Sequence, residues 1–331
     1  MRAPAFWWKP SPDVVAHMLS PFGAVYGAIA SQRMNKSGER VGAPVICVGN
    51  FVAGGAGKTP TAIAIARELQ RAGETPFFLS RGYGAQRDVA SPIVVDAASH
   101  TAADVGDEPL LLARAAPAIV CADRVAGARM AIAKGANVIV MDDGLQNPSL
   151  AKDIRIAVVD GGVGVGNGLC IPAGPLRAPL AAQLLLVDAL IIIGEGDAGA
   201  MIGAMAQSRN LPVIRARLSP DADASARLRG QRVLAFAGIG RPAKFFETLA
   251  SIGAKIVATR SFPDHHRFTL EELAELRKQA DANDAILVTT EKDQARIGPQ
   301  FAVNTLPVTL EPAEPGLFAA VVRAVLEKRN T

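Results

Sequence analysis

A glycine-rich run that ends in lysine and threonine occupies residues 49–60 and has the residue types of a phosphate-binding loop. Successive backbone N–H groups of such a loop surround phosphate oxygens, and the following helix presents its positive N-terminus to them. Lys58 would neutralise the β- and γ-phosphates of a nucleotide, and the Thr59 hydroxyl would bind Mg²⁺. The residues predicted to contact the nucleotide are Gly54, Gly55, Ala56, Gly57, Lys58, Thr59 and Pro60.

This loop departs from the general pattern at one position, because Val52 stands where glycine is expected. A glycine-rich turn before a helix can also be a matter of backbone geometry without any ligand. The Gly-Lys-Thr sequence lies between a strand-like segment, 44–48, and a helical one, 58–72, and this context favours the nucleotide. We therefore expect ATP and Mg²⁺ as cofactors.

Two adjacent carboxylates follow a second apolar segment. Residues 138–141 read as a buried strand, and Asp142 and Asp143 come directly after it. Ligands of parallel sheets bind at the carboxyl ends of the strands, so both side chains are candidate Mg²⁺ ligands beside Thr59. The alternative is that the acids cap the next turn.

Further short motifs follow along the chain. They are Ser80-Arg81-Gly82-Tyr83-Gly84, Gly106-Asp107-Glu108-Pro109, Ala122-Asp123-Arg124, Asp142-Asp143-Gly144-Leu145-Gln146, Pro172-Ala173-Gly174-Pro175-Leu176-Arg177, Phe262-Pro263-Asp264-His265-His266 and Thr290-Glu291-Lys292-Asp293. Together with the P-loop, this set resembles the tetraacyldisaccharide 4′-kinase family over nearly the whole chain. The resemblance implies transfer of the ATP γ-phosphoryl group to the 4′-hydroxyl of a tetraacyldisaccharide 1-phosphate, in lipid A biosynthesis.

The resemblance also implies roles for individual residues. Asp107 looks like the base that activates the acceptor hydroxyl, with His265 as its partner. Asp107 could instead cap the helix that begins beside it, and His265 could be an ordinary loop histidine with His266 as its rival. The predicted substrate or phosphate contacts are Arg81, Tyr83, Arg124, Gln146 and Arg177, although any of the arginines could form a surface ion pair.

Two positions depart from the family pattern. Ala178 stands where the family commonly has glutamate after Leu-Arg, and Asn147 stands where it commonly has histidine. These departures put in doubt how this chain completes its metal or acceptor site. The cluster 291–293 has no assigned role.

The elements that must position these residues alternate between strand and helix. From residue 44 onward, apolar segments of four to six residues are separated by helical segments and short turns, as in a doubly wound parallel sheet. We predict an α/β, P-loop NTPase-like fold, with a membrane-associated segment over 1–40, a nucleotide-binding domain over 41–195 and a smaller α/β domain over 196–331. The second boundary carries a margin of about 15 residues.

The N-terminal segment has a different pattern. Apolar residues over 12–34 recur at helical spacing, Trp7 and Trp8 precede them, and cations flank the stripe, as in a helix lying in a membrane surface. The alternative is a helix docked on the protein's own core. Pro21 is expected to divide the helix, and no segment is expected to span a bilayer. With the family resemblance, the stripe predicts a monotopic enzyme on the cytoplasmic face of a Gram-negative inner membrane, in contact with anionic lipid.

Composition limits the remaining classes. The 331 residues are 50% hydrophobic and carry a net charge of +4, which suits acidic partners but is too small to indicate nucleic acid. Three cysteines without metal-like spacing fit a reducing compartment, and no obligate protein partner is evident. Two rival functions remain: a dethiobiotin-synthetase-like ligase, which needs no such N-terminus, and a membrane-recruited ATPase switch. The switch class usually has an additional lysine early in the loop, which residues 52–55 lack.

Overall fold

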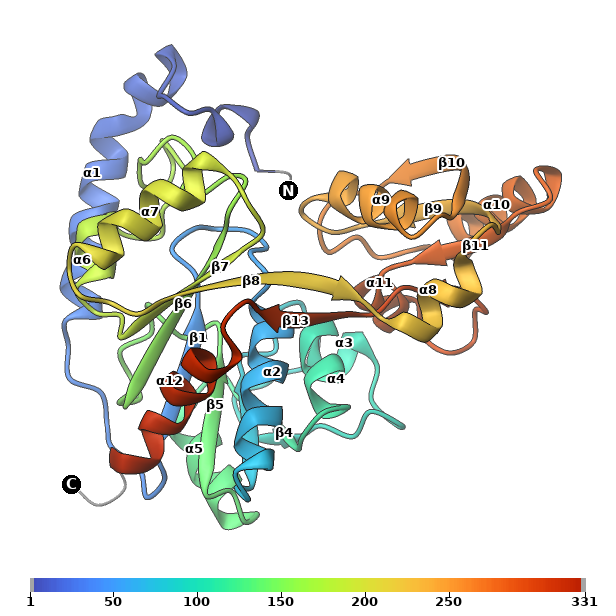
Figure 1. Ribbon diagram of the computed structural model, residues 1–331. Coiled ribbons are helices and arrows are strands. Elements are labelled where there is room, and N and C mark those ends of the chain that lie inside the picture. The colour runs from blue at the N-terminus through green and yellow to red at the C-terminus, as the bar shows by residue number, and fades with distance from the viewer. Residues whose placement is uncertain (1–2, 329–331) are drawn as a thin grey trace.

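The computed structural model describes residues 3–328, which form two sheets of different size (Figure 1). The larger sheet has nine strands in the order β13-β8-β7-β6-β1-β5-β2-β4-β3. Neighbouring strands are parallel except for the outermost strand at each edge, β13 and β3. The strand bounds are β1 (Val45–Gly49), β2 (Pro76–Ser80), β3 (Ile93–Val94), β4 (Ala118–Val120), β5 (Val138–Asp142), β6 (Ile154–Asp160), β7 (Ala189–Ile193), β8 (Val213–Pro220) and β13 (Val308–Pro312).

Helices cover both faces of this sheet, which confirms the predicted doubly wound α/β class. Alternate residues of β1 belong to different cores: Ile46 and Val48 pack on one side, and Val45 and Cys47 pack on the other. The helices of this part are α1 (Val14–Met34), α2 (Lys58–Arg71), α3 (Ala102–Val105), α4 (Asp107–Ala113), α5 (Arg124–Ala133), α6 (Leu180–Leu184), α7 (Asp197–Gln207) and α12 (Pro315–Glu327), after a short 3₁₀ helix η1 (Ala5–Trp8).

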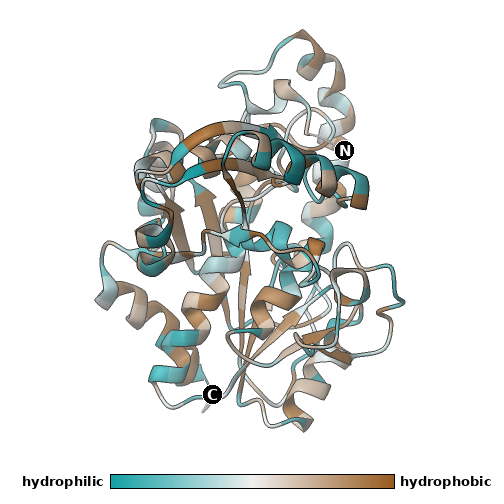
Figure 2. Ribbon diagram, turned by 90° about the vertical axis from the view of Figure 1, so that its right-hand side faces the viewer, coloured by the Kyte–Doolittle hydropathy of each residue, from teal (hydrophilic) through white to brown (hydrophobic). Residues whose placement is uncertain are grey.

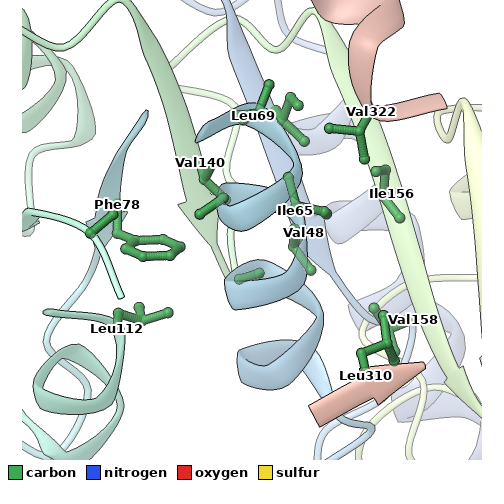
Figure 3. Packing of buried hydrophobic residues seen from close by; sticks show 14 of the residues in the cluster. Val48, Ile65, Leu69, Phe78, Leu112, Val140, Ile156, Val158, Leu310 and Val322 are labelled. Atoms are coloured by element: carbon green, nitrogen blue, oxygen red, sulfur yellow. The ribbon is translucent and has the colours of Figure 1, made fainter. Parts of the chain in front are cut away.

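Helix α2, which follows the P-loop, is fixed by the first of these cores. Ile65 and Leu69 of α2 belong to one buried cluster with Val48 and Val140 of the sheet. Val322 of α12 joins this cluster beside α2 (Figure 3). All five side chains are buried, and each contributes about 1.5–3 kcal/mol of transfer free energy. The C-terminal helix therefore packs back onto the nucleotide-binding half.

In the order of the chain, the smaller sheet comes between β8 and β13 of the larger one. It has the order β10-β9-β11-β12 and is entirely parallel. Its strands are β9 (Arg232–Ala237), β10 (Lys255–Ser261), β11 (Ile286–Thr289) and β12 (Asn304–Thr305), and its helices are α8 (Ala222–Leu228), α9 (Pro242–Ser251), α10 (Leu270–Ala282) and α11 (Glu291–Ile297). Brown strands and largely teal helix surfaces mark this lobe in Figure 2.

Sheet membership changes after β8 and again before β13, not near residue 195 where the sequence placed its boundary. The two strands pair antiparallel, with Leu218 opposite Leu310, and together lead from the larger sheet to the smaller lobe (Figure 1). The glycine- and aspartate-rich segment 194–199 suggested a linker, but it forms the turn after β7 and the first residues of α7 inside the larger part.

Helix α1 is continuous through Pro21, so the predicted division at this residue is wrong. A proline at this position leaves the His17 carbonyl without its helical donor, and the Ser20 hydroxyl donates to that carbonyl at 2.8 Å instead. Asp13 caps the helix by accepting from the Ala16 N–H.

The face of α1 that contacts the protein is made of small residues. Gly23 and Gly27 are buried, and a Cβ atom at Gly23 would lie 2.7 Å from the carbonyl oxygen of Cys170. The large apolar side chains point away from the protein: Val14, Val15, Met18, Phe22, Val25, Tyr26 and Ile29 are all exposed. By length and composition, α1 is one helix apolar enough to cross a membrane, whereas the sequence analysis expected no such segment.

Candidate active site

The P-loop connects β1 to α2 and has the backbone shape that its glycines allow. Gly54 and Gly57 have φ of 139° and 87°, which side chains with a Cβ atom rarely adopt. A Cβ atom at Gly57 would also lie 2.5 Å from Ile193. Lys58 is 8% exposed, and its Nζ donates to the Gly54 carbonyl at 3.3 Å, so the ammonium group lies over the loop.

The departure at Val52 has a structural reason. Val52 is buried and pairs in an antiparallel bridge with Leu176. The Ala53 N–H donates to the Pro175 carbonyl, and the Arg177 N–H donates to the Phe51 carbonyl. The first half of the P-loop is thus held in extended form by the segment 175–177, a conformation that valine adopts readily.

Asp142, at the end of β5, is 1% exposed, and both its carboxylate oxygens lack a hydrogen-bond partner. Burial, together with the charges of Glu108 and Asp143, raises the pKa of Asp142 to about 7. Asp143 follows with φ of 50° and pairs with both Nη atoms of Arg177, at 2.8 and 3.0 Å. Burial also raises the pKa of Asp143, but Lys58 and Arg177 outweigh it and bring the value to about 2.

These residues fit a Mg²⁺ ion. The Thr59 hydroxyl is buried without a partner, like both oxygens of Asp142, and buried polar atoms rarely remain unsatisfied unless something binds them. Within residues 3–328, no group of three or more His, Cys, Asp and Glu side chains could hold a metal. Mg²⁺ at a nucleotide needs no such group, because waters and phosphate oxygens supply most of its ligands.

Asp107 and His265 are adjacent although 158 positions separate them. Asp107 is the first residue of α4 and is 4% exposed, and its Oδ2 lies 3.5 Å from Nδ1 of His265. His265 follows β10 and has φ of 57°. Burial raises the pKa of Asp107, but the His265 hydrogen bond and the charges of Arg296 and Lys292 outweigh burial, so the net shift is downward.

The sequence analysis missed the main partner of Asp107. The Arg296 side chain is 6% exposed, and both Nε, at 2.8 Å, and Nη2 contact Oδ2 of Asp107. Its Nη1 donates to Asp293 at 2.8 Å and to the Gly238 carbonyl at 2.6 Å. Lys292, one turn earlier on α11, pairs with Glu108. The i, i+4 spacing of these two cations, beside the adjacent acids on α4, is the signal that could have found both pairs.

The structure shows which residues the cluster 291–293 contacts. α11 belongs to the smaller lobe and α4 to the larger one, and the two ion pairs join them. Asp293 is fully buried and accepts from the Gly238 N–H and the Thr290 hydroxyl. Asp293 therefore anchors the start of α11, while Glu291 and Lys292 line the cleft between the lobes.

One cleft of about 2270 Å³ lies between the two lobes and collects most of the predicted residues. Those that line it are Gly54, Gly55, Ala56, Gly57, Lys58, Thr59, Pro60, Arg81, Tyr83, Arg124, Asp142, Asp143, Gln146, Arg177 and His265. Asp107 does not line the cleft and lies behind His265.

The remaining predicted contacts have distinct surroundings. Tyr83 is 67% exposed and meets the edge of His265 at a ring distance of 5.2 Å. Arg124 is 2% exposed, and its Nε has no partner; burial and the nearby Arg81 lower its pKa. Two cations close together, one of them incompletely satisfied, favour an anion between them.

Gln146 belongs to a buried amide network that the sequence did not reveal. Its Nε2 donates to the Asn50 carbonyl and to Oε1 of Gln183, both at 2.8 Å. Gln183 is fully buried and donates to the carbonyls of Phe51 and Ala178. The network connects the P-loop to the loops that carry Asp143 and Arg177.

Neither departure from the family pattern supplies a charge to the cleft. Ala178 is fully buried, and its carbonyl accepts from Gln183 at 2.7 Å. Asn147 lines the cleft, but its Oδ1 accepts from the N–H and hydroxyl of Ser149. Neither residue therefore adds a metal ligand to the predicted set of Thr59, Asp142 and Asp143.

Comparison with known proteins agrees with this site. Residues 15–327 match the family described as tetraacyldisaccharide-1-P 4′-kinase. A tetraacyldisaccharide 4′-kinase of Methylobacterium sp. (strain 4-46) is 55% identical over 331 residues, covering 99% of each chain. One of Rhodopseudomonas palustris (strain BisB5) is 52% identical, covering 100% of this chain and 97% of that protein.

A solved structure shares the fold. The crystal structure of LpxK from Aquifex aeolicus in complex with ATP superposes with a TM-score of 0.73 at 24% identity, covering 94% of this chain and 99% of that one. The fold, the P-loop geometry and the match over almost the full length lead to one conclusion. The chain belongs to the tetraacyldisaccharide 4′-kinase family.

Proposed function

We propose that this chain transfers the γ-phosphoryl group of ATP to the 4′-hydroxyl of tetraacyldisaccharide 1-phosphate, giving lipid IVA in lipid A biosynthesis. The observation that carries the proposal is the P-loop of a family member, with Lys58 above it and the unpaired oxygens of Thr59 and Asp142 beside it. Bound Mg²⁺ would neutralise phosphate charge during transfer. Lys58 and the loop N–H groups hold the phosphates in place.

The acceptor hydroxyl needs a group that takes its proton. His265 lines the cleft and Asp107 supports it from behind, so the two act as a unit with His265 on the acceptor side. Asp107 stays ionised because Arg296 contacts it, and it orients the imidazole through Nδ1. As the bond to phosphorus forms, the hydroxyl proton passes to this pair.

Anion contacts would hold the two phosphorylated substrates. Arg177 is fixed by Asp143 and by the Val52 carbonyl, so it stands beside the P-loop. Arg81 and Arg124 both line the cleft, and Nε of Arg124 has no hydrogen-bond partner. We assign these arginines, with Tyr83 and Gln146, to the phosphates and the acceptor.

The exposed apolar face of α1 supports a location at a lipid surface. A substrate with four acyl chains does not leave the bilayer, because each buried CH₂ contributes about 0.8 kcal/mol. The outward-facing Met18, Phe22 and Ile29 can enter the acyl boundary, while Arg33 and Lys36 meet anionic headgroups. We propose the cytoplasmic face of the bacterial inner membrane as its location.

The test uses γ-labelled ATP, Mg²⁺ and tetraacyldisaccharide 1-phosphate in detergent micelles, with Lys58→Ala and Asp107→Ala alongside. We expect label in the lipid for the wild type and a large loss in both variants. Transfer that survives Asp107→Ala would remove Asp107 from the mechanism. Label released as inorganic phosphate at the same rate without lipid would contradict the kinase and favour the ATPase switch.

A further inference from the structure

Both tryptophans of the chain lie in η1, and the second of them contacts the P-loop. The ring of Trp8 lies against Gly54: a Cβ atom at Gly54 would be 3.6 Å from Cη2 and 3.7 Å from Cζ2 of the indole. Gly54 is also the residue whose carbonyl accepts from Nζ of Lys58. Gly54 therefore lies between the indole of Trp8 and Lys58, the lysine proposed to hold the transferred phosphate.

Hydrogen bonds fix η1 in this position. The Trp7 indole N–H donates to the Pro172 carbonyl at 2.9 Å, and the Trp7 carbonyl accepts from the Asn167 N–H at 2.8 Å. The buried Asn167 side chain also donates to the Phe6 carbonyl at 3.3 Å. The same loop continues to Arg177, which contacts Asp143. These hydrogen bonds of Phe6 and Trp7 hold the 3₁₀ helix, and with it Trp8, at the edge of the cleft.

The acceptor must pass this indole. A near-attack geometry puts the reacting hydroxyl about 3–3.5 Å from the phosphorus, so the sugar that bears it lies next to the P-loop. The cleft is lined by Gly54 and Lys58 of the P-loop region, by Trp7 and Trp8, and by Tyr26 of α1, the helix with the apolar outer face. Trp7 and Trp8 therefore share one cleft with the phosphate site and with α1.

A sugar ring and an indole are chemically complementary. The hydroxyl groups of a pyranose lie at its rim, whereas its C–H bonds form an apolar face that packs on an aromatic π-surface. We propose that Trp8 is a binding wall for the glucosamine ring that bears the reacting hydroxyl. This inference rests on the proposed function, because it takes the acceptor to be the acylated disaccharide.

The kinetic test compares Trp8→Ala and Trp8→Phe with wild type at a fixed detergent composition. Loss of the aromatic wall should raise KM for the acceptor about three- to tenfold for alanine and less for phenylalanine, with KM for ATP within about twofold. A rise in KM for ATP with an unchanged KM for the acceptor would overturn the proposal, because Trp8 would then only support the P-loop.

Vesicle binding separates the sugar from the membrane surface. Phe22→Ala, on the outer face of α1, should weaken binding to phosphatidylethanolamine–phosphatidylglycerol vesicles, whereas Trp8→Ala should leave that binding unchanged. A Trp8→Ala variant that loses vesicle affinity as Phe22→Ala does would make Trp8 an interfacial anchor and contradict the proposal.

Fluorescence provides a readout that does not need turnover. In Trp7→Phe, Trp8 is the only tryptophan, so emission reports on this wall alone. Acceptor in micelles should protect Trp8 from acrylamide quenching, whereas micelles with phosphatidylglycerol should not. Equal protection by both lipids would overturn the proposal. A wild type that transfers no phosphate to the lipid would instead contradict the proposed function, and the two failures are therefore distinguishable.

Discussion

Two pairs of adjacent carboxylates lie in or directly behind the cleft, and their surroundings differ. The first pair, Asp107 and Glu108, opens α4 in the larger lobe. Its partners, Arg296 and Lys292, come from α11 of the smaller lobe; the Asp107–Arg296 pair is buried and the Glu108–Lys292 pair is partly buried. These acids are neutralised by protein cations across the boundary between the lobes.

The second pair, Asp142 and Asp143, ends β5 next to the P-loop. Asp143 is paired with Arg177 from its own lobe, whereas both oxygens of Asp142 lack a hydrogen-bond partner. A satisfied carboxylate has its geometry fixed before any ligand binds, while an unsatisfied one is free to accept a metal ion. We propose that the first pair joins the lobes and orients His265, whereas the second pair receives the metal ion of the nucleotide.

The largest effect should come from removing the acid behind His265. Asp107→Asn keeps the shape but removes the charge that orients and stabilises the imidazole, and we expect phosphoryl transfer to fall by about 10²- to 10⁴-fold. Steady-state transfer of label to the lipid measures this, with Asp197→Asn, an exposed acid on α7, as control. A loss below tenfold would show that His265 works without it.

The next largest effect concerns the partner that joins the lobes. Arg296→Gln leaves Asp107 and Asp293 buried without their cation, and we expect the free energy of unfolding to fall by about 3–5 kcal/mol. Urea denaturation measures it. Arg129→Gln, which breaks an exposed pair with Glu39, is the matched control and should change stability by about 0–1 kcal/mol. Equal losses in both variants would contradict an interlobe role.

At Asp142, the unsatisfied carboxylate, we expect a substitution to raise the free energy of unfolding instead of lowering it. Asp142→Asn removes a buried charge that has no hydrogen-bond partner, so the metal-free protein should gain about 1–3 kcal/mol of stability. Asp143→Asn removes the partner of Arg177 and should lose stability instead. Thermal melting in EDTA compares the two, and a loss in both would mean that Asp142 has partners the structure does not record.

The smallest effect is on acid stability. The folded-state pKa of Asp107 is below its ordinary value of 3.8, so its contribution to stability is fully present above that value and is lost as pH falls through the folded-state pKa. Unfolding free energy should therefore decline below about pH 4, and the slope should be shallower in Asp107→Asn. Parallel slopes would remove Asp107 as a contributor.

The sequence prediction was most complete where a site is built from residues that are neighbours in the chain. The P-loop, the strand before it and the helix after it are contiguous, so Lys58 and Thr59 could be placed from spacing alone. Asp142 and Asp143 followed from a rule about strand ends. Their different pairing could not be predicted, because Arg177 lies 34 residues away and its direction depends on a loop.

Contacts between distant segments escaped prediction. Arg296 meets Asp107 across 189 positions, and only the packing of α11 on α4 brings them together. Trp7 and Trp8 looked like interfacial residues, yet Trp8 lies on Gly54. Pro21 indicated a helix break, but Ser20 supplies the missing donor and the tertiary contacts of the small-residue face keep α1 continuous.

The most direct test is the Mg²⁺ dependence of single-turnover transfer to the lipid, measured for wild type, Asp142→Asn and Asp107→Asn. The difference between the two carboxylate pairs predicts that Asp142→Asn raises the Mg²⁺ concentration for half-maximal rate by about tenfold or more. Asp107→Asn should lower the rate and leave that concentration unchanged. An unchanged Mg²⁺ requirement in Asp142→Asn, or a raised one in Asp107→Asn, would contradict the assignment of the metal to the second pair.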